Sequence, residues 1–153
     1  MTFRLLPVYL ALCLMAGSAA AQEREWTLDA SDQDAYLIFG VPESDDVGIS
    51  MWCPIGQGVV NVFIPQTASG LTAGKTVDMT ITAGDETASF KAKTETNEDA
   101  GTTSAEAQVA AAHAIFSAMT KADSFKVTVA ADEIAFPLFE ADVPGLIALC
   151  GKK

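Results

Sequence analysis

The sequence predicts an α+β domain: a mainly antiparallel sheet or partial sandwich, with one main helix and a short C-terminal helix packed on it, and one disulfide. Short apolar runs with period-two alternation fill residues 26–90, which is typical of strands. An alanine-rich stretch, residues 104–122, carries apolar side chains at helical spacing. Two of the three cysteines, Cys53 and Cys150, stand far apart in a chain that begins like an exported protein.

The N-terminus has the layout of a secretory signal peptide. One positive side chain, Arg4, precedes an apolar run, and small residues follow it. The run is roughly half the length that a membrane-spanning helix needs, which argues against a membrane anchor. We therefore predict cleavage between Ala21 and Gln22, a signal peptide over residues 1–21 and a single exported domain over residues 22–153, periplasmic or secreted.

The exported part is strongly acidic. The whole chain has 20 acidic and nine basic side chains, and removal of Arg4 leaves eight bases and a formal net charge of −12. Such a charge repels phosphate backbones and anionic lipids, so we expect no nucleic-acid or membrane-surface partner. This charge has two interpretations: it attracts a cationic partner, or, more simply, it is a soluble acidic surface.

The cysteine pattern predicts a disulfide. Cys13 leaves with the predicted signal peptide, so Cys53 and Cys150 are the pair that remains in an oxidising compartment. Closing so long a loop stabilises a fold by about 4–5 kcal/mol in the chain-entropy description. A redox-catalytic role is disfavoured because the chain has no C-x-x-C pair.

Alternation and turn residues place the elements. We expect strands over residues 26–28, 35–39, 47–53, 59–64, 76–83, 87–93, 125–130 and 134–138. The main helix is expected at about residues 108–121, although residues 104–109 could instead form an edge strand before a shorter helix. A terminal helix should begin near Asp142, carry Pro144 in its first turn and end at Cys150.

Two further segments carry structural expectations. Residues 94–103 have no hydrophobic side chain larger than alanine, which predicts an exposed, mobile loop. The pattern A-x-D-E-x-A occurs at residues 83–88 and again at 130–135. We interpret this as the same turn chemistry reached twice rather than as a duplicated unit.

The residues do not assemble a recognisable catalytic or metal site. His113 is the one histidine, and its helical spacing to Val109 and Phe116 indicates packing. No G-x-S-x-G motif surrounds a serine, and one histidine with two bridged cysteines cannot supply a zinc site. We therefore expect no catalytic residues, no metal and no cofactor.

The segment ISMWCP, residues 49–54, contains the most distinctive side chain. Alternation sends Met51 and Trp52 to opposite faces, so one of them packs in the core against the predicted bridge. An outward Trp52 would be an anchor for a partner. We take Trp52, with Asp45 and Asp46 of the preceding turn, as the candidate interaction residues, and core packing of Trp52 remains the alternative.

A series of short motifs runs along the exported part in a fixed order. They are Met51-Trp52-Cys53, Val62–Pro65, Leu71–Lys75, His113–Lys121, Phe125–Leu138 and Gly145–Cys150. This order resembles the invasion-associated locus B proteins of Gram-negative bacteria and, about equally, a small accessory protein of type VI secretion. Neither resemblance offers catalytic residues to carry over, and both imply a binding or accessory role.

Together these features predict a non-enzymatic periplasmic binding or accessory protein of the cell envelope, whose partner is an unidentified envelope or secreted protein. Two alternatives stay open. One is an acidic inhibitor or scavenger of a cationic target such as a lytic enzyme, based on the negative charge. The other is a hydrolase, which would have to use His113 as its base.

Overall fold

The computed structural model describes residues 23–67 and 70–152. The predicted signal peptide, its cleavage point after Ala21 and Cys13 lie outside the described residues and stay predictions.

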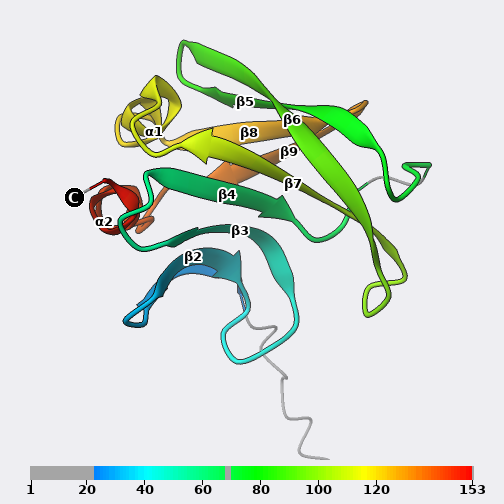
Figure 1. Cartoon of the computed structure of the whole chain (residues 1–153), viewed down its shortest axis with the longest axis horizontal. Helices are drawn as coiled ribbons and strands as arrows, with labels where there is room; N and C mark the ends of the chain where they lie inside the picture. Colours follow the sequence, from blue (N-terminus) through cyan, green and yellow to red (C-terminus); the bar gives the residue numbers. More distant parts are fainter. Residues whose placement is uncertain (1–22, 68–69, 153) are drawn as a thin grey trace, which may run out of the picture.

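Nine antiparallel strands form one sheet in the described part of the chain (Figure 1). They are β1 (Glu25–Ala30), β2 (Asp34–Gly40), β3 (Val47–Pro54), β4 (Val59–Ile64), β5 (Thr76–Ala83), β6 (Glu86–Asn97), β7 (Thr102–Ala110), β8 (Ser124–Val129) and β9 (Asp132–Pro137). Their order across the sheet is β1-β2-β3-β4-β7-β6-β5-β8-β9, and the sheet curls into an open half-barrel. The predicted antiparallel sheet is confirmed, whereas the partial sandwich is not, because these strands share a single sheet.

The predicted main helix is wrong in extent. Helix α1 (Ala114–Met119) has only six residues, because β7 takes the chain as far as Ala110. Within β7 the buried apolar side chains are those of Ala105, Ala107 and Val109, which is a strand period of two. The alternative of a strand before a shorter helix is found, but β7 lies between β4 and β6 rather than at an edge.

The predicted mobile loop over residues 94–103 is also wrong. β6 continues to Asn97 and β7 begins at Thr102, so only a short turn separates the two strands. Thr94 is buried, and its hydroxyl donates to the carbonyl of Thr72 at 2.8 Å and accepts from the amide of Lys75 at 3.0 Å. Small polar side chains form strands here because paired backbones and side-chain hydrogen bonds satisfy them.

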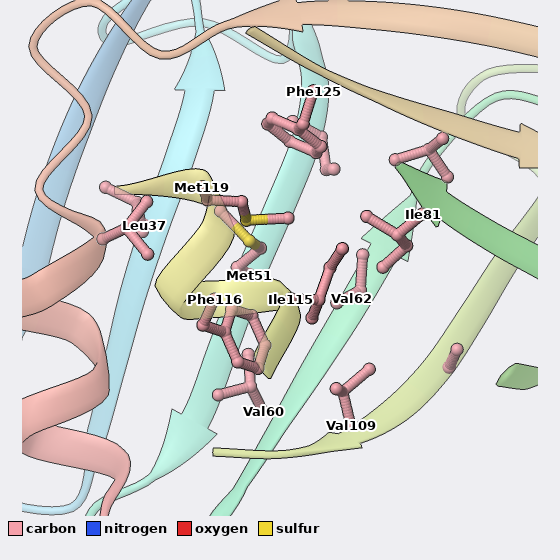
Figure 2. Close-up of a cluster of buried hydrophobic side chains, with 14 of the residues drawn as sticks. Leu37, Met51, Val60, Val62, Ile81, Val109, Ile115, Phe116, Met119 and Phe125 are labelled. Carbon is pink, nitrogen blue, oxygen red and sulfur yellow. The ribbon is translucent and has the colours of Figure 1, made fainter. Parts of the chain in front are cut away.

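The strand order explains where α1 packs. The chain must travel from β7 to β8, past β6 and β5, and α1 lies against those two strands on the way. Figure 2 shows its side chains Ile115, Phe116 and Met119 among those of the sheet, including Met51 and Val60. All five are at most 2% exposed, so this concave face of the half-barrel holds the core.

The C-terminal helix is confirmed where the sequence predicts it. Helix α2 (Val143–Cys150) has Asp142 as its N-cap, whose carboxylate accepts from the amide of Gly145 at 2.9 Å. The predicted disulfide is also confirmed: Cys150 is bonded to Cys53 of β3, with their Cα atoms 5.7 Å apart. The disulfide therefore joins the helix that follows edge strand β9 to β3, which lies near the opposite edge of the sheet.

Trp26 links the two edge strands of the sheet. Its Nε1 donates to the carbonyl of Pro137 in β9 at 2.6 Å. Its ring lies 5.2 Å from that of Phe39 and 6.3 Å from that of Phe125, measured between centroids. Because β1 and β9 are at opposite ends of the strand order, this contact helps to close the half-barrel.

The two hairpin turns that share the A-x-D-E-x-A pattern differ in structure at corresponding positions of that pattern. Ala83 pairs with Glu86, so Gly84 opens the first turn, whereas Val129 pairs with Asp132, so Ala130 opens the second. Both opening residues have φ of 55°, but only one is a glycine. The repeated pattern is thus offset by one residue in the structure, which supports shared turn chemistry over duplication.

The positive φ of Ala130 yields a stability prediction. Ala130→Gly should raise the free energy of unfolding by about 0.5–1 kcal/mol in urea denaturation, because a Cβ is strained at positive φ and glycine is not. The control is Ala131→Gly, whose site is not among the residues with positive φ and should therefore gain nothing. Equal effects of the two substitutions would contradict the strain explanation.

Candidate functional site

The convex face of the sheet carries a group of aromatic side chains. In β2 the neighbours Ala35 and Leu37 are fully buried on the core side, which turns Tyr36 outward. In β3 the fully buried Met51 likewise turns Trp52 outward. Phe63 of β4 follows the same rule, and the three aromatic side chains are half-buried.

Direct strand pairing brings two of these rings together. Tyr36 and Trp52 are cross-strand partners, and their rings stack with centroids 5.9 Å apart and planes at 16°. Such pairs stabilise by about 0.5–1.5 kcal/mol beyond their buried area. The indole Nε1 of Trp52 donates to Oε2 of Glu106 in β7 at 3.1 Å, which fixes the orientation of the ring.

These residues line a surface groove of about 950 Å³. Its floor includes the aromatic side chains Tyr36, Trp52 and Phe63, and its carboxylates are Asp45, Asp99 and Glu106. We call this the outer-face groove. Its walls are the β2–β3 loop and the β6–β7 hairpin, which project from the same end of the sheet (Figure 1).

The β2–β3 loop is tied to the sheet. The guanidinium of Arg24 donates from both Nε and Nη2 to Oδ1 of Asp46, just before β3. Gly40 at the end of β2 allows the loop to fold back closely, since a Cβ there would meet the carbonyl of Asp46 at 2.6 Å. Asp45 therefore stands on a loop that is held at both ends.

The β6–β7 wall is tied in the same manner. The side-chain amide of Asn97 donates to the carbonyl of Pro65 at 3.0 Å. The hydroxyl of Thr67 donates to the carbonyl of Thr103 at 2.7 Å. These bonds join the hairpin to the segment after β4, so Asp99 at its tip faces a floor and wall that are already formed.

Charge divides the convex face into two parts. Among the described residues, the lining of the outer-face groove has three carboxylates and no lysine or arginine. A second groove of about 560 Å³ shares Phe63 and Glu106 with it, and that groove also contains Lys91 and Lys93. The acidic half is therefore the part that contains the stacked aromatic pair.

The structure brings together two of the three predicted interaction residues. Trp52 and Asp45 line the same groove, whereas Asp46 does not line it and is paired with Arg24. Sequence reasoning missed Tyr36 and Phe63. The available signal was alternation, because each stands between inward-facing apolar residues at a position where a polar side chain is usual on a solvent-facing strand.

His113 has a structural role at the start of α1. It is the N-cap residue, and its Nδ1 accepts from the amide of Ile115 at 3.1 Å. Its ring meets that of Phe90 edge-on, with centroids 5.2 Å apart. His113 packs against Phe90, but the predicted helical face shared with Val109 is wrong, because Val109 lies in β7. The bond from the amide of Ile115 occupies the nitrogen that a catalytic carboxylate would orient.

Over residues 23–67 and 70–152, no helix is long and apolar enough to cross a membrane. The same described residues contain no group of three or more histidine, cysteine or carboxylate side chains placed to hold a metal ion. Comparison of the chain with protein-family models, curated proteins and solved structures finds no match in any of the three.

Proposed function

We propose that this protein is a non-enzymatic binding or accessory protein of the cell envelope, and that it contacts its partner through the outer-face groove. The observation that carries the proposal is the stacked pair of Tyr36 and Trp52, oriented by Glu106, at the floor of that groove. Tryptophan and tyrosine are enriched among the few residues that dominate binding energies at protein interfaces. A stacked pair with a fixed indole is already organised for such contact.

Other features support the same proposal. The disulfide is compatible with an oxidising periplasmic or extracellular location. The residue that a hydrolase would need, His113, caps a helix and packs on Phe90. The resemblance to envelope-associated exported proteins carries the same implication of a binding or accessory role.

The proposal is tested by a pull-down of envelope proteins with the tagged, disulfide-bonded protein. We expect a specific partner to be retained by the wild type and its recovery to fall about tenfold or more with Trp52→Ala. Phe139→Ala is the matched control, because Phe139 is 79% exposed and does not line the groove. Equal recovery with Trp52→Ala, or no retained partner, would contradict the proposal.

A second candidate function is an acidic inhibitor or scavenger of a cationic target such as a lytic enzyme. The observation in its favour is the acidic lining of the groove by Asp45, Asp99 and Glu106, with no basic side chain from residues 23–67 and 70–152. Binding of such a target should weaken steeply as salt is added, because the carboxylates Asp45 and Asp99 are exposed and screened by ions.

A further inference from the structure

We infer that the occupant of the outer-face groove is an extended, arginine-bearing segment of a partner protein, with guanidinium groups placed on the aromatic floor and between the groove carboxylates. The inference rests on the proposed function, because it names the chemistry of the partner at the same groove.

Charge is the first step of the argument. Asp45 of the β2–β3 loop, Asp99 of the β6–β7 turn and Glu106 of β7 line one groove, and no lysine or arginine of the described residues lines it. Asp46, the neighbour of Asp45, is neutralised by Arg24 outside the groove. The groove carboxylates thus lack an internal cation, and a cationic partner would be complementary to them.

The aromatic floor is the second step. A cation placed over a tryptophan or tyrosine face is attracted by the ring quadrupole. The bond from the Trp52 indole to Oε2 of Glu106 holds a carboxylate beside the ring without cancelling its charge. Arginine fits this pairing better than lysine, because its planar guanidinium stacks on rings and bonds carboxylates with two parallel N–H groups.

The size and polarity of the groove are the third step. A volume of about 950 Å³ lies near the upper end of the range of roughly 300–1,000 Å³ that accommodates drug-sized ligands. Ile38, Val47 and Pro65 add apolar surface beside the carboxylates. The aliphatic stems of arginine cover apolar surface while their heads reach charge, so a peptide segment fits both parts better than a compact small cation.

The test uses the purified, disulfide-bonded protein and a fluorescein-labelled peptide with arginine at alternate positions, in a fluorescence anisotropy titration. The comparison peptide carries glutamine at the same positions. We expect the arginine peptide to bind at least about tenfold more tightly than the glutamine peptide, and Glu106→Gln and Asp99→Asn each to weaken its binding several-fold. Raising the salt concentration should weaken it as well.

Asp85→Asn is the matched control. It removes the same unit of charge at the exposed β5–β6 turn, outside the groove, and should leave binding of the arginine peptide within about twofold of the wild type. If Asp85→Asn weakens binding as much as Asp99→Asn, only overall charge matters and the inference is overturned. Equal binding of the two peptides also overturns it, as does competition by free spermidine at the same concentration as the peptide.

The outcomes separate this inference from the proposed function. Should an envelope partner be lost with Trp52→Ala while the arginine peptide fails to bind, the groove is the partner site and its chemistry has been assigned wrongly. Should the peptide bind and respond to Glu106→Gln while the pull-down retains no partner, the groove chemistry is supported and the envelope partner is not.

Discussion

Removal of the disulfide by Cys53→Ala together with Cys150→Ala should lower the free energy of unfolding by about 4–5 kcal/mol. The two cysteines are separated by 97 positions, so the bond removes a large amount of conformational freedom from the unfolded chain. Both are fully buried, which adds the loss of well-packed side-chain atoms. Urea denaturation of the wild-type and doubly substituted proteins measures the difference.

Reduction of the wild-type protein provides the control, because it breaks the bond and keeps both sulfur atoms. It should produce most of the same loss. Amide hydrogen exchange should also rise at Gly56 and Gly58, whose amides donate to the carbonyls of Leu149 and Cys150 at 2.9 and 2.7 Å. A loss below about 1 kcal/mol on reduction would show that packing of α2 alone holds the C-terminus.

The sequence predicted those elements that alternation or turn residues mark clearly. β4 and β5 were predicted with the bounds that the structure has: in β5 the buried Met79 and Ile81 alternate with aspartate and threonine, and the apolar run of β4 is bounded by Gly58 and Pro65. The terminal helix was predicted from Asp142, Pro144 and the following Gly151, which are local signals for helix ends. The disulfide followed from compartment and cysteine count.

The alanine-rich segment shows why other elements could not be predicted. Ala105 and Ala107 face the core, but alanine is too small to distinguish a strand face from a helix face, and its intrinsic preference is helical. The strand forms because β4 and β6 pair with β7 on both sides, as Val62 does with Ala107 and Ala92 with Ala107. That pairing is a tertiary effect that no local window contains.

The candidate site was predictable only in part for a related reason. Trp52 and Asp45 are close in sequence, so a turn and a strand suffice to place them together. Glu106 is 54 positions from Trp52 and reaches it because β7, rather than β5, pairs with β4. The crossover that sets this order leaves no trace in alternation or turn residues, so the carboxylate beside the indole could not be anticipated.

Trp26→Ala should cost about 3–5 kcal/mol of unfolding free energy, whereas Trp52→Ala should cost less than about 2 kcal/mol. Trp26 is 9% exposed, packs on Phe39 and Phe125, and joins edge strands β1 and β9 through its bond to Pro137. Its removal opens a cavity between the sheet edges. Trp52 is half-buried on the convex face, so its truncation leaves a surface notch rather than a cavity.

The two substitutions should differ in their effect on binding. Trp26→Ala, measured at a temperature where it is still folded, should keep the affinity for the arginine peptide within about threefold of the wild type, because it lies on the core face. Trp52→Ala should lose most of that affinity while it stays folded.

Trp26→Phe separates packing from hydrogen bonding. It retains an aromatic ring beside Phe39 but cannot donate to Pro137, so its stability should fall between those of the wild type and Trp26→Ala. If Trp52→Ala proves as destabilising as Trp26→Ala, its ring belongs to the packing of the fold, and the aromatic pair on the convex face is no argument for a partner.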